Sequence, residues 1–231
     1  MRIHGLQKLA MVDYPGKLAA TVFTGGCDLR CPFCHNALLV TRLSESPALT
    51  EDEVLEFLKK RRGLLDGVVL SGGEPLLQAG AADFLAAVRQ LGFAVKLDTN
   101  GFYPQALREI LDRGLADYVA MDVKNSPERY GETAGVLGLD LGPVRESVSY
   151  LLSGAVDYEF RTTVVREFHD RESFRAIGPW LSGARRYFLQ SFTDRDTVLQ
   201  PGLHPCSREE LEAFAALVRP HVDEVSLRGL E

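Results

Sequence analysis

The chain has 231 residues, of which 45% are hydrophobic and 25% are charged. This is the composition of an ordinary soluble globular protein, and a chain of this length buries a sizeable core without disulfide bonds. The formal net charge of −6 disfavours nucleic acid as a partner, because nucleic-acid-binding proteins usually carry a basic excess.

The N-terminal segment contains no apolar core of about 7–15 residues, so we expect no signal peptide. The sequence has no run of about 18 or more apolar residues, so we expect no membrane span. We therefore expect a cytoplasmic protein with no membrane partner, in a compartment that keeps thiols reduced. Three of the four cysteines lie within eight residues, which in such a compartment indicates a metal site rather than disulfides.

Short β-rich runs alternate with amphipathic helical segments along the chain. The expected strands, in chain order, cover residues 19–24, 67–71, 93–98, 118–123, 158–165 and 186–190, with a short closing strand at 224–227. Capping boxes at Thr50 and Ser207 open two of the expected helices, and Gly63 is expected to end the first of them. The remaining helices are expected over residues 81–91, 104–113, 143–152 and 171–181.

Six βα units in sequence predict a parallel sheet with helices outside, and an open doubly wound sheet and a barrel both fit this pattern. No linker or low-complexity run divides the chain, so we expect a single domain over residues 1–231. A complete barrel of eight units usually needs about 250 residues. Six units therefore favour an incomplete barrel, whose open side is available to something large.

Cys27, Cys31 and Cys34 form a C-x3-C-x2-C motif directly after the first expected strand, where parallel folds place active sites. Structural zinc normally takes four ligands, but there is no second cysteine pair, His35 is poorly placed for the same ion, and Cys206 lies far along the chain. Three thiolates suit a cluster of four irons that leaves one iron open to a substrate. A zinc knuckle and incidental buried thiols are the alternatives on spacing alone.

Polar motifs also follow the next expected strands. Ser71-Gly-Gly-Glu-Pro75 follows the second strand, Asp98-Thr-Asn-Gly101 the third, and Asp122-Val-Lys124 ends the fourth. Taken singly, these motifs are also typical of plain turns, helix caps or a solvated lysine. Together they favour a site for a zwitterionic ligand, in which Lys124 neutralises a carboxylate as a point charge.

Two questions stay open at this point. Asp98 and Asp122 either share a cation or meet the positive groups of the ligand. Arg161, in the next strand region, either reaches the ligand carboxylate or only pairs with Asp122.

The cysteine spacing, with the aromatic Phe33 just before the third cysteine, resembles that of the radical S-adenosylmethionine (SAM) superfamily. The resemblance implies a [4Fe–4S] cluster on the three cysteines, whose open iron chelates the amine and carboxylate of SAM. Electron transfer from the reduced cluster then cleaves SAM and makes a 5′-deoxyadenosyl radical. In this superfamily the segment that matches Gly72, Gly73 and Glu74 holds the methionyl amine.

The runs Val12-Asp-Tyr-Pro-Gly16, Val22-Phe-Thr-Gly-Gly-Cys27 and Cys31-Pro-Phe-Cys-His-Asn36 closely resemble anaerobic ribonucleoside-triphosphate reductase activating proteins. Pyruvate formate-lyase activating enzymes carry D-G-P-G in place of D-Y-P-G, and both groups share the D-T-N-G and D-(L/V)-K motifs. The resemblance covers residues 6–193 and implies an α/β fold, a partial (β/α)6 barrel of the radical SAM type.

In the pyruvate formate-lyase activating enzymes, a monovalent cation touches the cofactor carboxylate. The resemblance implies that Asp98, Thr99, Asp122 and the backbone carbonyl of Ala120 would surround it here. It further implies cofactor contacts from Phe33, His35 through its backbone, Gly72, Gly73, Glu74, Asp98, Asn100, Lys124, Arg161 and Thr163. Thr193 stands where those enzymes carry a histidine, so the role of that histidine is not carried over.

We expect an activase that removes a hydrogen atom from a glycine Cα of a glycyl-radical enzyme, by resemblance the anaerobic ribonucleotide reductase. The glycine loop of the partner would enter the incomplete barrel and help exclude water. A flavodoxin-like or ferredoxin-like protein is the expected electron donor, and Cys206 is interpreted as a stray thiol. The alternatives are an activase of another glycyl-radical enzyme, a radical enzyme that acts on a small molecule such as a deazapurine precursor, and a metal-binding regulatory module.

Overall fold

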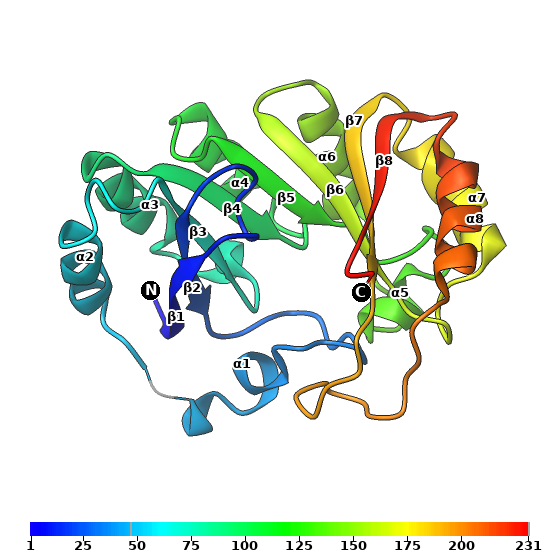
Figure 1. Ribbon diagram of the computed structural model, residues 1–231, viewed down its shortest axis with the longest axis horizontal. Coiled ribbons are helices and arrows are strands. Elements are labelled where there is room, and N and C mark those ends of the chain that lie inside the picture. Colours follow the sequence, from blue (N-terminus) through cyan, green and yellow to red (C-terminus); the bar gives the residue numbers. More distant parts are fainter. Residues whose placement is uncertain (47, 231) are drawn as a thin grey trace.

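The frame of the molecule is one curved sheet of eight strands, shown in Figure 1 as a computed structural model that describes residues 1–46 and 48–230. The first strand, β1 (Ile3–Ala10), runs antiparallel to β2, and the strands from β2 to β8 run parallel in chain order. The parallel strands are β2 (Ala19–Thr24), β3 (Gly67–Gly72), β4 (Ala94–Thr99), β5 (Tyr118–Asp122), β6 (Asp157–Val164), β7 (Ala184–Ser191) and β8 (Val222–Arg228). The predicted parallel α/β sheet is confirmed.

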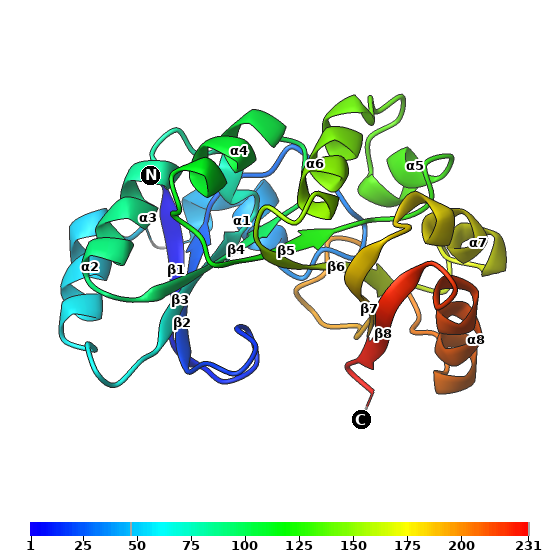
Figure 2. The ribbon, with the colours of Figure 1, turned by 90° about the horizontal axis from the view of Figure 1, so that it is seen from above.

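Helices connect the parallel strands and cover the convex face of the sheet (Figure 2). They are α2 (Glu51–Lys59), α3 (Ala81–Gln90), α4 (Pro104–Asp112), α6 (Gly142–Leu152), α7 (Arg171–Trp180) and α8 (Arg208–Val218). Their apolar stripes form the main core, as Val54 and Leu58 of α2 illustrate, since both are fully buried. The six predicted βα units are therefore present, with β8 as the closing strand.

Both predicted capping boxes form. The Thr50 hydroxyl accepts the N–H of Glu53, and the Glu53 carboxylate accepts the N–H of Thr50. The same pair of bonds joins Ser207 and Glu210 at the start of α8. These bonds satisfy amide groups that the first turn of a helix leaves without partners, so the two helices begin where the sequence predicts.

Several elements depart from the sequence prediction. Strand β1 was not expected, because it is a half-exposed edge strand whose pairing with β2 decides its structure. Helix α2 ends at Lys59 rather than near Gly63, since Arg61 N–H bonds to the Leu58 carbonyl and tightens the chain into a turn. The short helices α1 (Ala37–Thr41) and α5 (Tyr130–Ala134) were also not expected, because each is a single five-residue element.

The strand order runs from β1 to β8, so these two strands form the edges of the described sheet and the barrel is incomplete. Polar side chains pair across its inner face. Glu159 of β6 accepts hydrogen bonds from Tyr118 of β5 at 2.8 Å and from Arg228 of β8 at 2.7 and 2.9 Å. Inside the barrel, buried charges are thus paired with opposite charges and hydrogen-bond donors.

A small apolar cluster closes the barrel near the beginning of the parallel strands. It consists of Tyr14, Ala19, Val69 and Tyr118, with Tyr14 contributed by the connection between β1 and β2. The Tyr14 ring lies 6.1 Å from that of Tyr118, and its hydroxyl donates to the Val95 carbonyl at 3.4 Å. The D-Y-P-G run therefore packs the barrel bottom. No helix in the described part of the chain is long and apolar enough to cross a membrane.

Candidate active site

A pocket with a volume of about 250 Å³ lies where the parallel strands end, opposite the Tyr14 cluster. The loop after β2 and the C-terminal ends of β3 to β7 surround it. The lining residues are Cys27, Leu29, Cys31, Phe33, Cys34, His35, Asn36, Val40, Ser71, Gly72, Gly73, Glu74, Asp98, Thr99, Asn100, Asp122, Lys124, Arg161, Thr163 and Gln190. The structure thus brings every predicted site residue except Ala120 to this pocket. Ala120, predicted for its carbonyl, is buried in β5.

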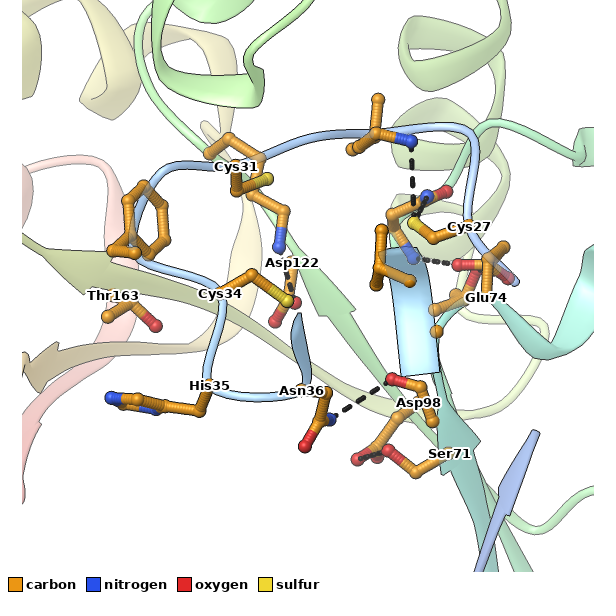
Figure 3. A pocket seen from close by; sticks show the side chains of 18 of the residues that line it. Cys27, Cys31, Cys34, His35, Asn36, Ser71, Glu74, Asp98, Asp122 and Thr163 are labelled. Carbon is orange, nitrogen blue, oxygen red and sulfur yellow. Dashed lines mark hydrogen bonds and ion pairs between the residues drawn. The ribbon is translucent and has the colours of Figure 1, made fainter. Parts of the chain in front are cut away.

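Three cysteines on one loop line the upper wall of this pocket, and Figure 3 shows their sulfur atoms directed into the same space. All three are free thiols. Cys27 Sγ accepts the N–H of Leu29 at 3.4 Å. The loop is held from outside by the N–H of Arg30, which donates to the Ala134 carbonyl of α5 at 2.9 Å.

Burial disfavours the ionised form of the three thiols. Burial raises the pKa of Cys27 to about 12 and that of Cys31 to about 11, and it also raises the pKa of Cys34, although the Lys124 ammonium opposes each shift. Among the described residues, no three His, Cys, Asp or Glu side chains converge on a point where one ion would sit. Three separate thiols around a cavity fit a polynuclear iron–sulfur cluster, in which each sulfur binds a different iron.

The glycine pair after β3 packs directly on the backbone that leads into the cysteine loop. Gly72 has φ +127°, and a Cβ there would lie 2.2 Å from the Thr24 nitrogen. A Cβ on Gly73 would lie 2.0 Å from the Gly26 oxygen. Only glycine permits this approach, which brings β3 and the cysteine loop to the same pocket.

Glu74 joins the loops that follow β3 and β4. Its buried carboxylate accepts the Thr99 hydroxyl at 2.8 Å, the Asn100 N–H at 2.7 Å and the Leu76 N–H at 3.0 Å. Burial raises the pKa of Glu74 to about 7, although these donors oppose the shift. In this structure the carboxylate is therefore used to hold the D-T-N-G loop in place.

Five charged side chains form a network at the floor of the pocket, and all of them except Lys96 line it. Asp122 pairs with Arg161 and, at 2.7 Å, with Lys124. Asp98 pairs with Lys96 and, at 3.3 Å, with the same Arg161. Burial by itself would raise the pKa of both aspartates, but the neighbouring cations outweigh it and lower both. Arg161 therefore both pairs with Asp122 and lines the pocket.

His35 directs its side chain away from the cysteines (Figure 3). Its ring stacks on Phe192 with centroids 5.5 Å apart, and its Nε2–H donates to the Thr193 carbonyl at 2.7 Å. The imidazole thus links the cysteine loop to the connection between β7 and α8. Thr193 itself is exposed and lies outside the pocket lining.

Sequence reasoning missed some of the lining residues. Ser71 and Asn36 stand inside motifs that the sequence singled out, and each makes a bond at the site: Ser71 Oγ donates to Asp98 at 3.1 Å and Asn36 Nδ2 donates to the Gly72 carbonyl at 3.2 Å. Leu29, Val40 and Gln190 carry no comparable signal. Cys206 is buried in the main core and does not line the pocket.

Comparison with known proteins places this pocket in a family. The family model described as "Radical SAM superfamily" matches residues 21–170. A Methanocaldococcus jannaschii protein, whose name describes it as a glycyl-radical enzyme activating enzyme, is 31% identical over 99% of this chain and 96% of its own length. The pyruvate formate-lyase 1-activating enzyme of Escherichia coli K12 is 31% identical over 73% of this chain and 70% of its own length.

Solved structures share the fold. A domain of the pyruvate-formate lyase-activating enzyme from Bacteroides vulgatus superposes with a TM-score of 0.58 at 16% identity, over 71% of this chain and 99% of that chain. Streptococcus suis SuiB bound to S-adenosylmethionine superposes with a TM-score of 0.70 at 15% identity, over 89% of this chain and 49% of that chain. Fold and pocket define a radical SAM enzyme, and the chain belongs to the glycyl-radical enzyme activating enzymes of that superfamily.

Proposed function

We propose that this protein, with residues 1–231 acting as one radical SAM domain, activates the anaerobic ribonucleoside-triphosphate reductase by removing a hydrogen atom from a glycine Cα. The observation that carries the proposal is that three free thiols and a charged network face one pocket. Cys27, Cys31 and Cys34 would hold the [4Fe–4S] cluster. When bound and reduced, the cluster and SAM supply a 5′-deoxyadenosyl radical.

The charged network suits the carboxylate of SAM. Lys96, Lys124 and Arg161 carry three positive charges, and Asp98 and Asp122 carry two negative ones, so one positive charge remains. A single ligand carboxylate would balance it. Lys124 and Arg161 line the pocket and would make the direct contacts.

The glycine segment suits the methionyl amine. The N–H of Gly73 already donates to the Thr24 carbonyl at 2.9 Å, and the N–H of Glu74 donates to the Gly26 carbonyl at 2.8 Å. With these donors in use, the segment offers a ligand acceptor groups, which match an ammonium.

Other lining residues complete the proposed SAM site. Phe33, the backbone of His35, Asn100 and Thr163 would contact the rest of the cofactor. Asn100 is held in position by a bond from its Nδ2 to Asp28 at 2.9 Å. The monovalent cation is the least supported part of this site, because Asp98 and Asp122 already carry cations of the chain itself.

The choice of the reductase as partner rests on the sequence and on the open sheet, not on the pocket. The D-Y-P-G run favours the reductase over pyruvate formate-lyase, and the unclosed barrel between β1 and β8 would admit a glycine loop. A flavodoxin-like or ferredoxin-like protein would deliver the electron in the reducing cytoplasm, where the four free cysteines keep their thiols.

Electron paramagnetic resonance tests the proposal. The reconstituted protein is mixed anaerobically with reductant, SAM and either an anaerobic ribonucleoside-triphosphate reductase or a pyruvate formate-lyase. We expect a glycyl doublet with the reductase, and none when Cys31→Ala replaces the wild type. A doublet with pyruvate formate-lyase alone would reassign the partner. Rapid turnover of a small metabolite without any protein partner would reject the activase function.

A further inference from the structure

Lys96 is a buried lysine in the middle of β4, where a strand normally carries an apolar residue. It is 2% exposed, and its ammonium pairs with Asp98, two residues further along the same face of the strand. A buried ammonium is costly unless it is paired, so this lysine has a definite electrostatic role.

The carboxylates that would bind a monovalent cation are already occupied on both sides. Asp98 contacts Lys96 through one oxygen, and its other oxygen lies 3.3 Å from Arg161 and 3.1 Å from the Ser71 hydroxyl. Asp122 contacts Arg161 through one oxygen and Lys124 through the other. Every carboxylate oxygen in the expected cation site thus faces a cationic side chain.

Of the other two expected cation ligands, the Thr99 hydroxyl already makes two hydrogen bonds. The Thr99 hydroxyl donates to Glu74 and accepts the N–H of Gly101 at 3.1 Å, so it is engaged in both directions. Ala120 lies beside Asp98 in the register of β4 and β5. Arg161 of β6 reaches across β5 to Asp98, at 3.3 Å.

Charge balance points the same way. The network carries one excess positive charge without any ion, and a bound metal cation would raise this to two. It would also place that cation within a few ångströms of Lys96, Lys124 and Arg161, where like charges repel because these side chains are largely buried.

We propose that two cations of the chain itself, the Lys96 ammonium on Asp98 and the Arg161 guanidinium between Asp98 and Asp122, take the place of the monovalent cation, so that SAM binding by this protein needs neither sodium nor potassium. The inference rests on the proposed function. It departs from the cation site that the resemblance implies, and the departure follows from a lysine on β4 that the motif comparison does not include.

The first test uses the wild-type holoenzyme. The dissociation constant for SAM is measured by equilibrium dialysis in choline chloride, and again in potassium or sodium chloride at the same ionic strength. We expect equal affinity in all three salts. Affinity that rises about tenfold with potassium or sodium would overturn the proposal.

Two substitutions of Lys96 separate the effect of its charge from the effect of the space that its side chain fills. Lys96→Ala removes the ammonium and leaves a space, so SAM affinity should fall about tenfold or more in choline and recover with potassium. Lys96→Met removes the charge but fills the space, so its affinity should fall without recovery. Lys59→Ala, at an exposed lysine of α2, is the matched control and should bind as the wild type does. Wild-type affinity in both Lys96 variants would overturn the proposal.

A third measurement does not depend on SAM or on the folding of a variant. Crystals of the wild-type protein are soaked with thallium(I), and its anomalous scattering is mapped. We expect no peak between Asp98 and Asp122, and a peak there would overturn the proposal. If the wild type fails to bind SAM at all, the proposed function fails, while the thallium map still decides the role of Lys96.

Discussion

The cysteines show most directly how position decides the chemistry of a residue. Cys27, Cys31 and Cys34 line the pocket, whereas Cys206 is packed in the apolar core. Burial raises the pKa of all four thiols, so the thiol group alone does not distinguish them. Only the three on the loop have the open space that a cluster requires.

Replacing any one of the three loop cysteines with alanine is expected to abolish the cluster and the cleavage of SAM, because each sulfur is proposed to hold one iron. Cys206→Ala should keep both and lose only a little stability. Iron content and the spectrum of the reduced cluster measure the outcome. Loss of iron in Cys206→Ala, with retention in Cys31→Ala, would show that the ligands are wrongly assigned.

Glu74 makes stability depend on pH. Its pKa is about 7 in the folded protein and near 4.5 in the unfolded chain, so the folded state binds the extra proton between these values. The stabilisation is complete below about pH 4.5 and is lost as the pH rises toward 7. Relative to Glu74→Gln, the wild type should lose up to about 3 kcal/mol over this range.

Chemical denaturation of both proteins across that pH range measures the difference. Glu209→Gln, at an exposed glutamate of α8, is the control and should show no such trend. A difference between wild type and Glu74→Gln that stays constant with pH would contradict the raised pKa.

Among the elements, the connection between β1 and β2 packs at the end of the barrel opposite the pocket. It places Tyr14, which is 3% exposed, against Ala19, Val69 and Tyr118 at the barrel bottom. The D-Y-P-G run thus has a packing role. Its effect on function would pass through the stability of the barrel.

Tyr14→Ala is expected to destabilise the protein by about 3–5 kcal/mol, because it leaves a cavity in place of a buried aromatic ring. The melting temperature should fall by roughly 10 °C. Tyr14→Phe should change little, since it loses only a hydrogen bond of 3.4 Å. Cluster content should stay normal in both variants. Loss of the cluster in Tyr14→Ala at unchanged stability would contradict a packing role.

At the scale of the whole molecule, the sheet formed by residues 1–46 and 48–230 stays open between β1 and β8. The connection from β7 to α8 is bonded to the cysteine loop through His35 and through the N–H of Gln200 on the Pro32 carbonyl. Figure 1 shows this connection beside the segment that leads to α1. A partner would have to supply the remaining cover.

Without a partner, the reduced protein is therefore expected to cleave SAM slowly and without a lasting product radical. A cognate glycyl-radical enzyme should speed cleavage and consume about one SAM per radical, because alignment comes only with its glycine loop in place. A peptide that copies the loop should work less well, since it must be ordered on binding. Quantifying 5′-deoxyadenosine against the glycyl doublet measures this ratio, and fast cleavage by the protein alone would contradict it.

Local signals in the sequence were enough to predict the parallel strands, the capping boxes and the cysteine loop. Each depends on residues close together in the chain: alternating apolar runs, the Thr50–Glu53 and Ser207–Glu210 spacings, and three cysteines within one turn-rich segment. The rule that parallel strands end at one side of the sheet then placed the polar motifs together, as the pocket confirms.

Tertiary structure decided what depends on contacts between distant segments. Strand β1 exists because β2 pairs with it, and Tyr14 lies far from the pocket because the β1–β2 connection turns toward the barrel bottom. The sequence did not single out Lys96. Its partner Asp98 also contacts Arg161 and Ser71, and the fold brings these residues together from other strands. Periodicity reports which face a residue occupies, whereas the charge that it meets there is set by the register of the other strands.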